Sequence, residues 1–185
     1  TIRDRLKHIL ASAYRAKDLV KQILTFSRRT DREKVPVVLT PIIKETLKFL
    51  RSSLPATIKI NARYDAVHSS VLGDSTQMYQ VMMNLCTNAA HAMGEKGGML
   101  KVGLSTVSFE SIDLEPRAEL KPGPYITLSV QDTGCGMTPE MVTRIFDPFY
   151  TTKRQGEGTG LGLAVVHGIV KAMEGAISVK TQIGA

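Results

Sequence analysis

The sequence contains no tryptophan, and Phe, Tyr and Trp together make up only 5% of its 185 residues. Its two cysteines, Cys86 and Cys135, lie far apart and form no Cys-x-x-Cys pair, so neither a zinc site nor a disulfide framework is indicated. Few cysteines fit a reducing compartment, and we expect a cytoplasmic location. No apolar run approaches the ~20 residues of a membrane span, and the charged start does not resemble a signal peptide, so we expect no membrane contact within this chain.

Positive charge is concentrated at one end of the chain. The formal net charge is +7, and residues 1–34 hold ten of the 24 Lys and Arg residues against four acids. The rest of the chain is therefore nearly neutral. Aromatic residues are few and no nucleic-acid reading motif is present, so we expect no nucleic-acid partner.

Residues 2–29 are predicted to form one long helix. Apolar residues recur at alternating steps of four and three, which is the heptad pattern of a coiled coil or helical bundle. They are Ile2, Leu6, Ile9, Ala13, Ala16, Val20 and Ile23. A helix with this apolar face requires a partner helix, and a charged linker that ends at Lys34 separates it from the remainder.

From Val35 onward, strands and helices alternate. The predicted strands are 35–39, 57–63, 99–109, 124–132 and 176–181, and the predicted helices are 40–53, 74–93, 138–145 and 161–173. Pro41 and Pro139 suit the first turn of a helix, and Asp74 with Gln77 predicts a capping box. The order indicates an α+β two-layer sandwich in which helices cover one face of a sheet.

Three amide side chains share one face of the helix predicted over 74–93. Gln80, Asn84 and Asn88 recur every four residues, and the residues between them are largely apolar. Such a stripe either hydrogen-bonds to neighbouring backbone or offers amide oxygens to a hard cation such as Mg²⁺, which takes few protein ligands.

A carboxylate and two glycines follow the apolar stretch 125–130. In Asp132-Thr133-Gly134-Cys135-Gly136 the carboxylate could accept a hydrogen bond from an exocyclic amine, while the glycines let a ring approach the backbone. The same pattern is also typical of a simple turn capped by Asp132.

A glycine-rich loop, Gly156-Glu157-Gly158-Thr159-Gly160-Leu161-Gly162, precedes the last predicted helix. Glycines before a helix N-terminus can bring backbone N–H groups to a phosphate. The loop lacks the Gly-Lys-Ser/Thr ending of a P-loop, and no register fits Gly-x-Gly-x-x-Gly. The loop is therefore a phosphate-contacting lid or a linker, and Lys153 ahead of it is either a phosphate donor or a solvated side chain.

In this order the motifs NLCTNAAHAM, DTGCGM, IFDPFYTTK and GEGTGLGL resemble the asparagine, first glycine, phenylalanine and second glycine boxes of sensor histidine kinases. The resemblance covers residues 35–185 and implies an ATP-binding catalytic domain with a mixed sheet covered by three helices. RAKDLVKQILTFSRR resembles the second helix of the dimerisation hairpin. Residues 1–34 are thus expected to be part of a hairpin that forms a homodimer in the full-length protein, and the domain is expected to lack its last strand.

The resemblance also assigns roles to residues. It implies that Asn88 binds Mg²⁺ with Asn84 beside it, and that Asp132 reads the adenine amino group of ATP, with Gly134 and Gly136 against the base. The other residues that it places at the nucleotide are His91, Thr152, Lys153, Gly158, Thr159, Gly160, Leu161 and Gly162.

The family's reaction transfers the γ-phosphoryl group to a histidine and then to an aspartate of a response-regulator receiver. His8 lacks the acidic neighbour of the family's phosphoacceptor motif, so we expect the acceptor histidine outside this chain. An ATP-hydrolysing relative would carry a glutamate where Asn84 stands, and an amide cannot act as a base at neutral pH. A non-catalytic binding module is the remaining alternative.

Overall fold

The structure is a computed structural model that describes residues 34–66, 69–109, 120–153 and 158–184. The helix predicted over residues 2–29, with the division at residue 34, lies outside the described residues. None of the helices in the described ranges is both long and apolar enough to cross a membrane.

The described strands form a mixed sheet of three strands and a separate pair. In the sheet, β2 (Ile58–Tyr64) runs parallel to β4 (Gly98–Phe109), and β4 runs antiparallel to β5 (Gly123–Gln131). The separate antiparallel pair consists of β1 (Val35–Val38) and β3 (Ser70–Gly73).

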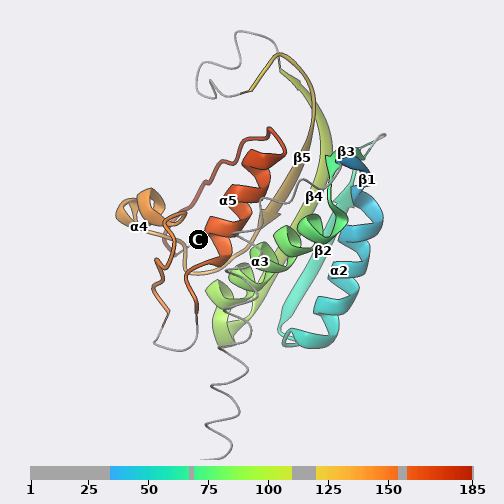
Figure 1. The fold of residues 1–185 in the computed structure, drawn as a ribbon. Coiled ribbons are helices and arrows are strands. Elements are labelled where there is room, and N and C mark those ends of the chain that lie inside the picture. Colours follow the sequence, from blue (N-terminus) through green and yellow to red (C-terminus); the bar gives the residue numbers. More distant parts are fainter. Residues whose placement is uncertain (1–33, 67–68, 110–119, 154–157, 185) are drawn as a thin grey trace, which may run out of the picture.

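Three helices cover one face of the sheet, which confirms the predicted α+β sandwich (Figure 1). They are α2 (Leu39–Ser53), α3 (Ser75–Met93) and α5 (Gly162–Ala172), with α3 packed between the other two. A short 3₁₀ turn, η1 (Gly94–Lys96), follows α3, and the short α4 (Pro139–Arg144) lies apart from the sheet.

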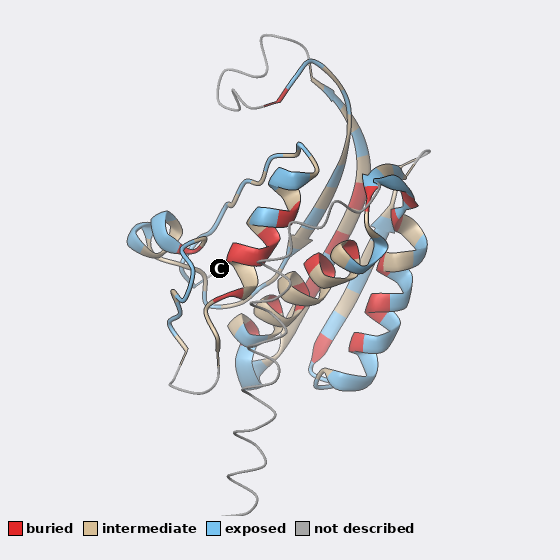
Figure 2. Ribbon diagram, in the orientation of Figure 1, coloured by how far each residue is buried: buried red, intermediate tan, exposed pale blue. Residues whose placement is uncertain are grey.

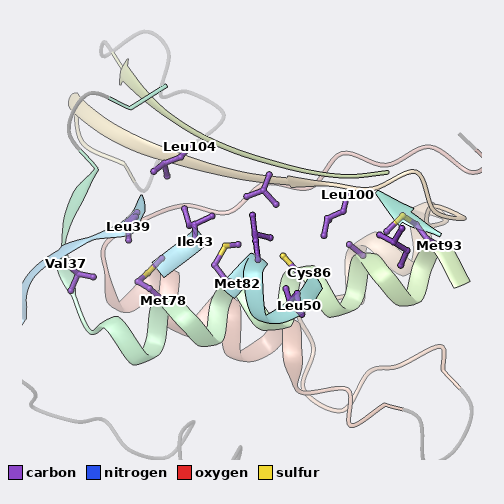
Figure 3. Packing of buried hydrophobic residues seen from close by; sticks show 14 residues of the cluster. Val37, Leu39, Ile43, Leu50, Met78, Met82, Cys86, Met93, Leu100 and Leu104 are labelled. Atoms are coloured by element: carbon purple, nitrogen blue, oxygen red, sulfur yellow. The ribbon is translucent and has the colours of Figure 1, made fainter. Parts of the chain in front are cut away.

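The core lies between the helices and the sheet (Figures 2 and 3). Met82 and Cys86 of α3 and Leu100 of β4 have 0% of their surface exposed. Full burial of a leucine or methionine side chain contributes about 1.5–3 kcal/mol to stability. The one buried polar side chain in the described core, Thr46, donates its hydroxyl proton to the carbonyl of Ile42 at 2.7 Å.

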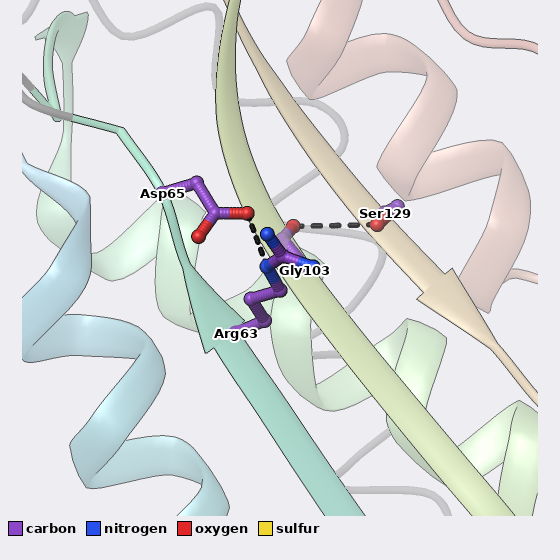
Figure 4. A network of polar contacts seen from close by, with 4 residues as sticks. All are labelled: Arg63, Asp65, Gly103 and Ser129. Atoms are coloured by element: carbon purple, nitrogen blue, oxygen red, sulfur yellow. Dashed lines mark hydrogen bonds and ion pairs between the residues drawn. The ribbon is translucent and has the colours of Figure 1, made fainter.

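The other face of the sheet carries polar side chains. Arg63 and Asp65 form an ion pair at 2.5 Å between Nε and Oδ2, and Ser129 donates to the carbonyl of Gly103 at 3.4 Å (Figure 4). Both pairs are exposed, so their net contribution to stability is small.

Two predicted helix starts are confirmed by their caps. Asp74 accepts a hydrogen bond from the Thr76 N–H at 2.7 Å, and Thr138 accepts one from the Met141 N–H at 3.3 Å, with Pro139 at the first helical position. The helix predicted over 40–53 begins one residue earlier, at Leu39, whose N–H donates to the Ser69 carbonyl at 2.7 Å.

Two strand assignments differ from the prediction. The strand β3 was not predicted, because its four residues are too short for a readable alternation. The strand predicted over 176–181 was wrong: these residues have no assigned strand structure, although Ile177 and Val179 are partly buried in alternation with exposed neighbours. Alternation therefore reports which side chains pack inward, and it does not report a hydrogen-bonded partner strand.

The two cysteines should react very differently with iodoacetamide. Cys86 is fully buried and burial raises its pKa to about 12, whereas Cys135 is exposed. Since the thiolate is the reacting form, we expect Cys86 to be alkylated about 100-fold or more slowly than Cys135 in the folded protein. Mass spectrometry of the two cysteine peptides measures both rates. Equal rates in the folded protein would contradict the placement of Cys86, and equal rates after denaturation in guanidinium are the control.

Candidate functional site

One face of α3 organises the candidate site. Asn84 and Asn88 are partly buried on this helix, and Ala92 continues the same face one further turn along. Positions four residues apart lie one above another on a helix, so these three residues form a row. The start of α5, Lys153 and the turn after β5 each lie against this row.

The N-terminus of α5 lies against the first part of the row. A Cβ added to Gly162 would stand 3.5 Å from Asn84 Oδ1 and 3.7 Å from Asn88 Nδ2. Glycine therefore lets the start of α5 approach both amides. Leu161 is the N-cap residue, its side chain makes no cap hydrogen bond, and its own N–H donates to Thr159 Oγ1 at 3.4 Å. The N–H groups of the first turn of α5 have no intrahelical partner and could bind an anion.

Lys153 reaches the row from the segment that precedes the glycine loop. Its Nζ lies 3.2 Å from Asn88 Oδ1 and 3.1 Å from His91 Nδ1. Burial lowers the pKa of Lys153 below its ordinary value. Desolvation thus disfavours the ammonium, the Asn88 oxygen compensates by accepting a hydrogen bond from it, and a phosphate at this place would gain a charged donor.

The turn after β5 contacts the far end of the row. The Cys135 N–H donates to the carbonyl of Ala92 at 3.1 Å, and a Cβ on Gly134 would stand only 2.6 Å from Ala92. Asp132 Oδ1 accepts the Gly134 N–H at 2.8 Å, which fixes the carboxylate beside this contact.

The glycine loop is attached to the segment before it. The Phe149 N–H donates to the Gly160 carbonyl at 3.0 Å, and both residues have positive φ angles, 68° and 67°. A Cβ on Gly160 would collide with the Phe149 backbone, and one on Gly158 would stand 2.9 Å from Lys153 Cδ. Gly160 is thus required, both for its close approach to the Phe149 backbone and for a φ that is costly for other residues, whereas Gly158 contacts only side chains.

The spacing along α3 suits a nucleotide. From Asn84 to Ala92 the helix rises ~12 Å, since each residue adds ~1.5 Å. The α5 N-terminus and Lys153 lie at the end with Asn84 and Asn88. The turn that contains Asp132, Gly134 and Cys135, here called the carboxylate turn, lies at the end with Ala92. A molecule with phosphates at one end and a hydrogen-bonding ring at the other would match both.

The donor set fits Mg²⁺ in one specific way. Within the described ranges there is no cluster of three or more His, Cys, Asp or Glu that could hold a metal. Asn88, however, turns its amide oxygen toward the lysine ammonium, so the oxygen already faces a cation. Mg²⁺ commonly takes one or two protein oxygens and completes its shell with phosphate and water.

Most of the predicted site residues therefore lie near one row. Asn84, Asn88, Lys153, His91 and Gly162 are brought together, and Asp132 and Gly134 lie at the other end. Of the other predicted residues, Gly136 instead packs against the backbone of Gln182, and Thr152 is exposed.

Sequence reasoning missed two contacts. Ala92 anchors the carboxylate turn, and the Thr87 carbonyl lies 2.6 Å from His91 Nδ1. The contact at Ala92 could have been suspected from the sequence, because a small residue stands one turn beyond Asn88. The contact at Thr87 involves a backbone carbonyl, which every residue has, so no sequence pattern indicates it.

The chain is similar to proteins of known kind. Residues 73–185 match the family model described as Histidine kinase-, DNA gyrase B-, and HSP90-like ATPase. The chain is 33% identical over 179 residues to the Sensor kinase CckA of Brucella abortus (strain 2308), which covers 97% of this chain but only 19% of that protein. The chain thus spans a minor part of this relative.

Two solved structures share the fold. ShkA full-length in complex with AMPPNP superposes with a TM-score of 0.73 at 24% identity, over 98% of this chain and 36% of that one. Histidine kinase ThkA in complex with response regulator protein TrrA gives a TM-score of 0.66 at 23% identity, over 95% of this chain and 46% of that one.

Proposed function

The chain belongs to the histidine kinase-, DNA gyrase B- and HSP90-like ATPase family, and from that premise we propose that it binds Mg²⁺·ATP and catalyses transfer of the γ-phosphoryl group to a histidine. The acceptor would be the histidine of a sensor kinase dimerisation hairpin. The similarity to CckA over nearly the whole chain supports the kinase branch of the family.

One observation carries the proposal: two amides and a lysine, rather than a carboxylate, meet at the α5 N-terminus. Asn88 Oδ1 accepts from Lys153 Nζ, and Asn84 lies against Gly162. In phosphoryl transfer the protein mainly positions the phosphates and neutralises their charge, and the nucleophile comes from elsewhere. The bound Mg²⁺ would neutralise phosphate charge; Asn88 would be its protein ligand.

The other residues would orient the nucleotide. Asp132 would accept a hydrogen bond from the adenine amino group, with Gly134 and Gly136 beside the ring. The Gly162 N–H would face the phosphates, as would the Leu161 N–H once it leaves Thr159 Oγ1, and Lys153 would donate to them. His91, Thr152, Gly158, Thr159 and Gly160 are proposed to line the same site.

The amide at position 84 favours phosphoryl transfer to a histidine over hydrolysis of ATP. A hydrolysing member of the family would need a group that takes a proton from water, and an amide has no basic lone pair at neutral pH. Without a base at this position, a bound water is a poor competitor for the γ-phosphoryl group. An imidazole already carries a nucleophilic nitrogen and needs no such base.

Membership of the kinase branch of the family also suggests partners for the chain. We propose a response-regulator receiver as the protein that takes the phosphoryl group onward, as suggested by the ThkA relative, whose structure is a complex with a response regulator. The homodimer through residues 1–34 of the full-length protein stays a prediction, because those residues lie outside the described ranges.

The test follows label from [γ-³²P]ATP with the full-length protein. We expect a phosphoprotein that is labile in acid and stable in alkali, as a phosphohistidine is, and little release of free phosphate by this chain alone. The control is the same assay with [α-³²P]ATP, which should label nothing. Rapid phosphate release by the isolated chain without phosphoprotein would instead favour the hydrolase.

A further inference from the structure

The Lys153 ammonium contacts the same amide oxygen that a metal ion bound by Asn88 would need. Its Nζ is 3.2 Å from Asn88 Oδ1, and Mg²⁺ binds oxygen at ~2.0–2.1 Å. Two cations on one oxygen would be at most about 5 Å apart, at a partly buried position where water screens them poorly. Their repulsion makes simultaneous occupation of this oxygen unfavourable.

His91 does not offer the lysine an equal alternative. The His91 Nδ1 lies 3.1 Å from Lys153 Nζ and 2.6 Å from the Thr87 carbonyl oxygen. A neutral imidazole nitrogen either donates or accepts a hydrogen bond, so Nδ1 cannot serve both contacts. The shorter contact is with a carbonyl, which only accepts, and it therefore assigns the proton to Nδ1. Asn88 Oδ1 remains as the acceptor for the ammonium.

The lysine side chain is also held in place along its length. A Cβ on Gly158 would stand 2.9 Å from Lys153 Cδ and 3.3 Å from Lys153 Cβ, so the aliphatic stem packs directly against that glycine. The Lys153 N–H donates to Thr151 Oγ1 at 3.2 Å. The ammonium is thus aimed at Asn88 by its surroundings rather than by the amide alone.

We propose that Lys153 and the Mg²⁺ of a bound nucleotide compete for the amide oxygen of Asn88, so that Lys153 sets the Mg²⁺ concentration that nucleotide binding requires. This inference rests on the proposed function. When Mg²⁺ takes the oxygen, the ammonium leaves Asn88, and in bound ATP it moves to an oxygen of the γ-phosphate. Lys153 is in this account a positioning residue that makes the site selective for nucleotide and metal together over either alone.

The test is calorimetric titration of ADP into the chain at a series of Mg²⁺ concentrations and constant ionic strength. ADP lacks the γ-phosphate, so the loss of a lysine contact to that group does not confuse the result. For Lys153→Met, which retains the stem, we expect the half-maximal Mg²⁺ concentration to fall roughly tenfold, as the loss of a competing charged hydrogen bond implies. Lys153→Arg keeps the charge and should leave the value within about twofold.

Lys48→Met is the matched control. Lys48 is exposed on α2, so this substitution removes the same charge away from the site. An equal fall for Lys48→Met, or an unchanged or higher value for Lys153→Met, would overturn the competition. Adenosine, which has no phosphate, should bind the wild type and Lys153→Met equally. If the wild type binds neither adenosine nor ADP, both the proposed function and this inference fail; if it binds both, only the metal dependence is in question.

A measurement on the wild-type protein guards against a variant that does not fold. With lysine labelled by ¹³C at Cε, the Lys153 resonance should shift when ADP and Mg²⁺ are added together. It should stay in place when ADP is added with a chelator. A resonance that does not respond to Mg²⁺·ADP would show that the ammonium keeps its position and would overturn the proposal.

Discussion

Replacing Asn88 by alanine should lower phosphoryl transfer from Mg²⁺·ATP by roughly 100-fold or more, the effect of removing one preorganised electrostatic contact from a reacting phosphate. The side chain supplies the oxygen that contacts the Lys153 ammonium and that is proposed to bind Mg²⁺. Mg²⁺ takes few protein ligands, so no neighbouring oxygen compensates for the loss. The measurement is the initial rate of phosphoprotein formation by the full-length protein at saturating ATP.

The fold should survive this change. Asn88 lies within α3, and alanine has a higher helix propensity than asparagine. We therefore expect the thermal midpoint of Asn88→Ala to stay close to that of the wild type, while the Mg²⁺ dependence of ADP binding disappears. Asn61→Ala is the matched control, because Asn61 is exposed on the sheet face opposite the helices. Full activity in Asn88→Ala, or equal losses in both variants, would contradict the assigned role.

The residues of the site could be predicted from the sequence because each belongs to a local pattern. Asn84 and Asn88 follow helical spacing, and Asp132 follows a strand that ends one residue earlier. Local backbone geometry determines both positions. The contact between Lys153 and Asn88 could not be predicted, because it joins residues 65 positions apart and depends on how two segments pack.

The fold was predictable to the same extent. The helices and the long strands have a clear apolar periodicity over many residues, which outweighs the weaker preferences of single residues. The helices α2, α3 and α5 therefore lie close to their predicted ranges. The errors concern strands, because backbone hydrogen bonding rather than side-chain burial determines whether a segment is a strand. β3 is paired although its pattern is unreadable, and residues 176–181 are unpaired although their pattern alternates.

The carboxylate turn provides the second large expected effect, at Gly134. A Cβ there would stand 2.6 Å from the backbone and side chain of Ala92 and 2.7 Å from Asp132 Oδ1. Neither the helix backbone nor the capped carboxylate can move without losing a hydrogen bond: Cys135 N–H to Ala92 O, or Gly134 N–H to Asp132 Oδ1. Overpacking of this kind costs about 1–3 kcal/mol of unfolding free energy.

Gly134→Ala should therefore lower stability and nucleotide affinity together, since the displaced Asp132 is the residue proposed to read adenine. We expect adenosine binding to weaken by at least tenfold, roughly the value of one hydrogen bond to a charged group, and chemical denaturation to give the loss of unfolding free energy. A variant with wild-type stability and adenosine affinity would show that the turn does not rest on α3 as described.

Gly168→Ala is the control that separates packing from glycine chemistry. Gly168 lies within α5 with a negative φ, and a Cβ there would have nothing within 4 Å. The same substitution should therefore raise the unfolding free energy by about 0.5–1 kcal/mol, because alanine favours the helix over the unfolded chain. Opposite signs at the two glycines would show that contact with Ala92, and not the loss of a glycine, makes position 134 intolerant. Adenosine affinity in Gly168→Ala should equal that of the wild type, so a fall there would mean that the start of α5 rather than the carboxylate turn controls binding of the base.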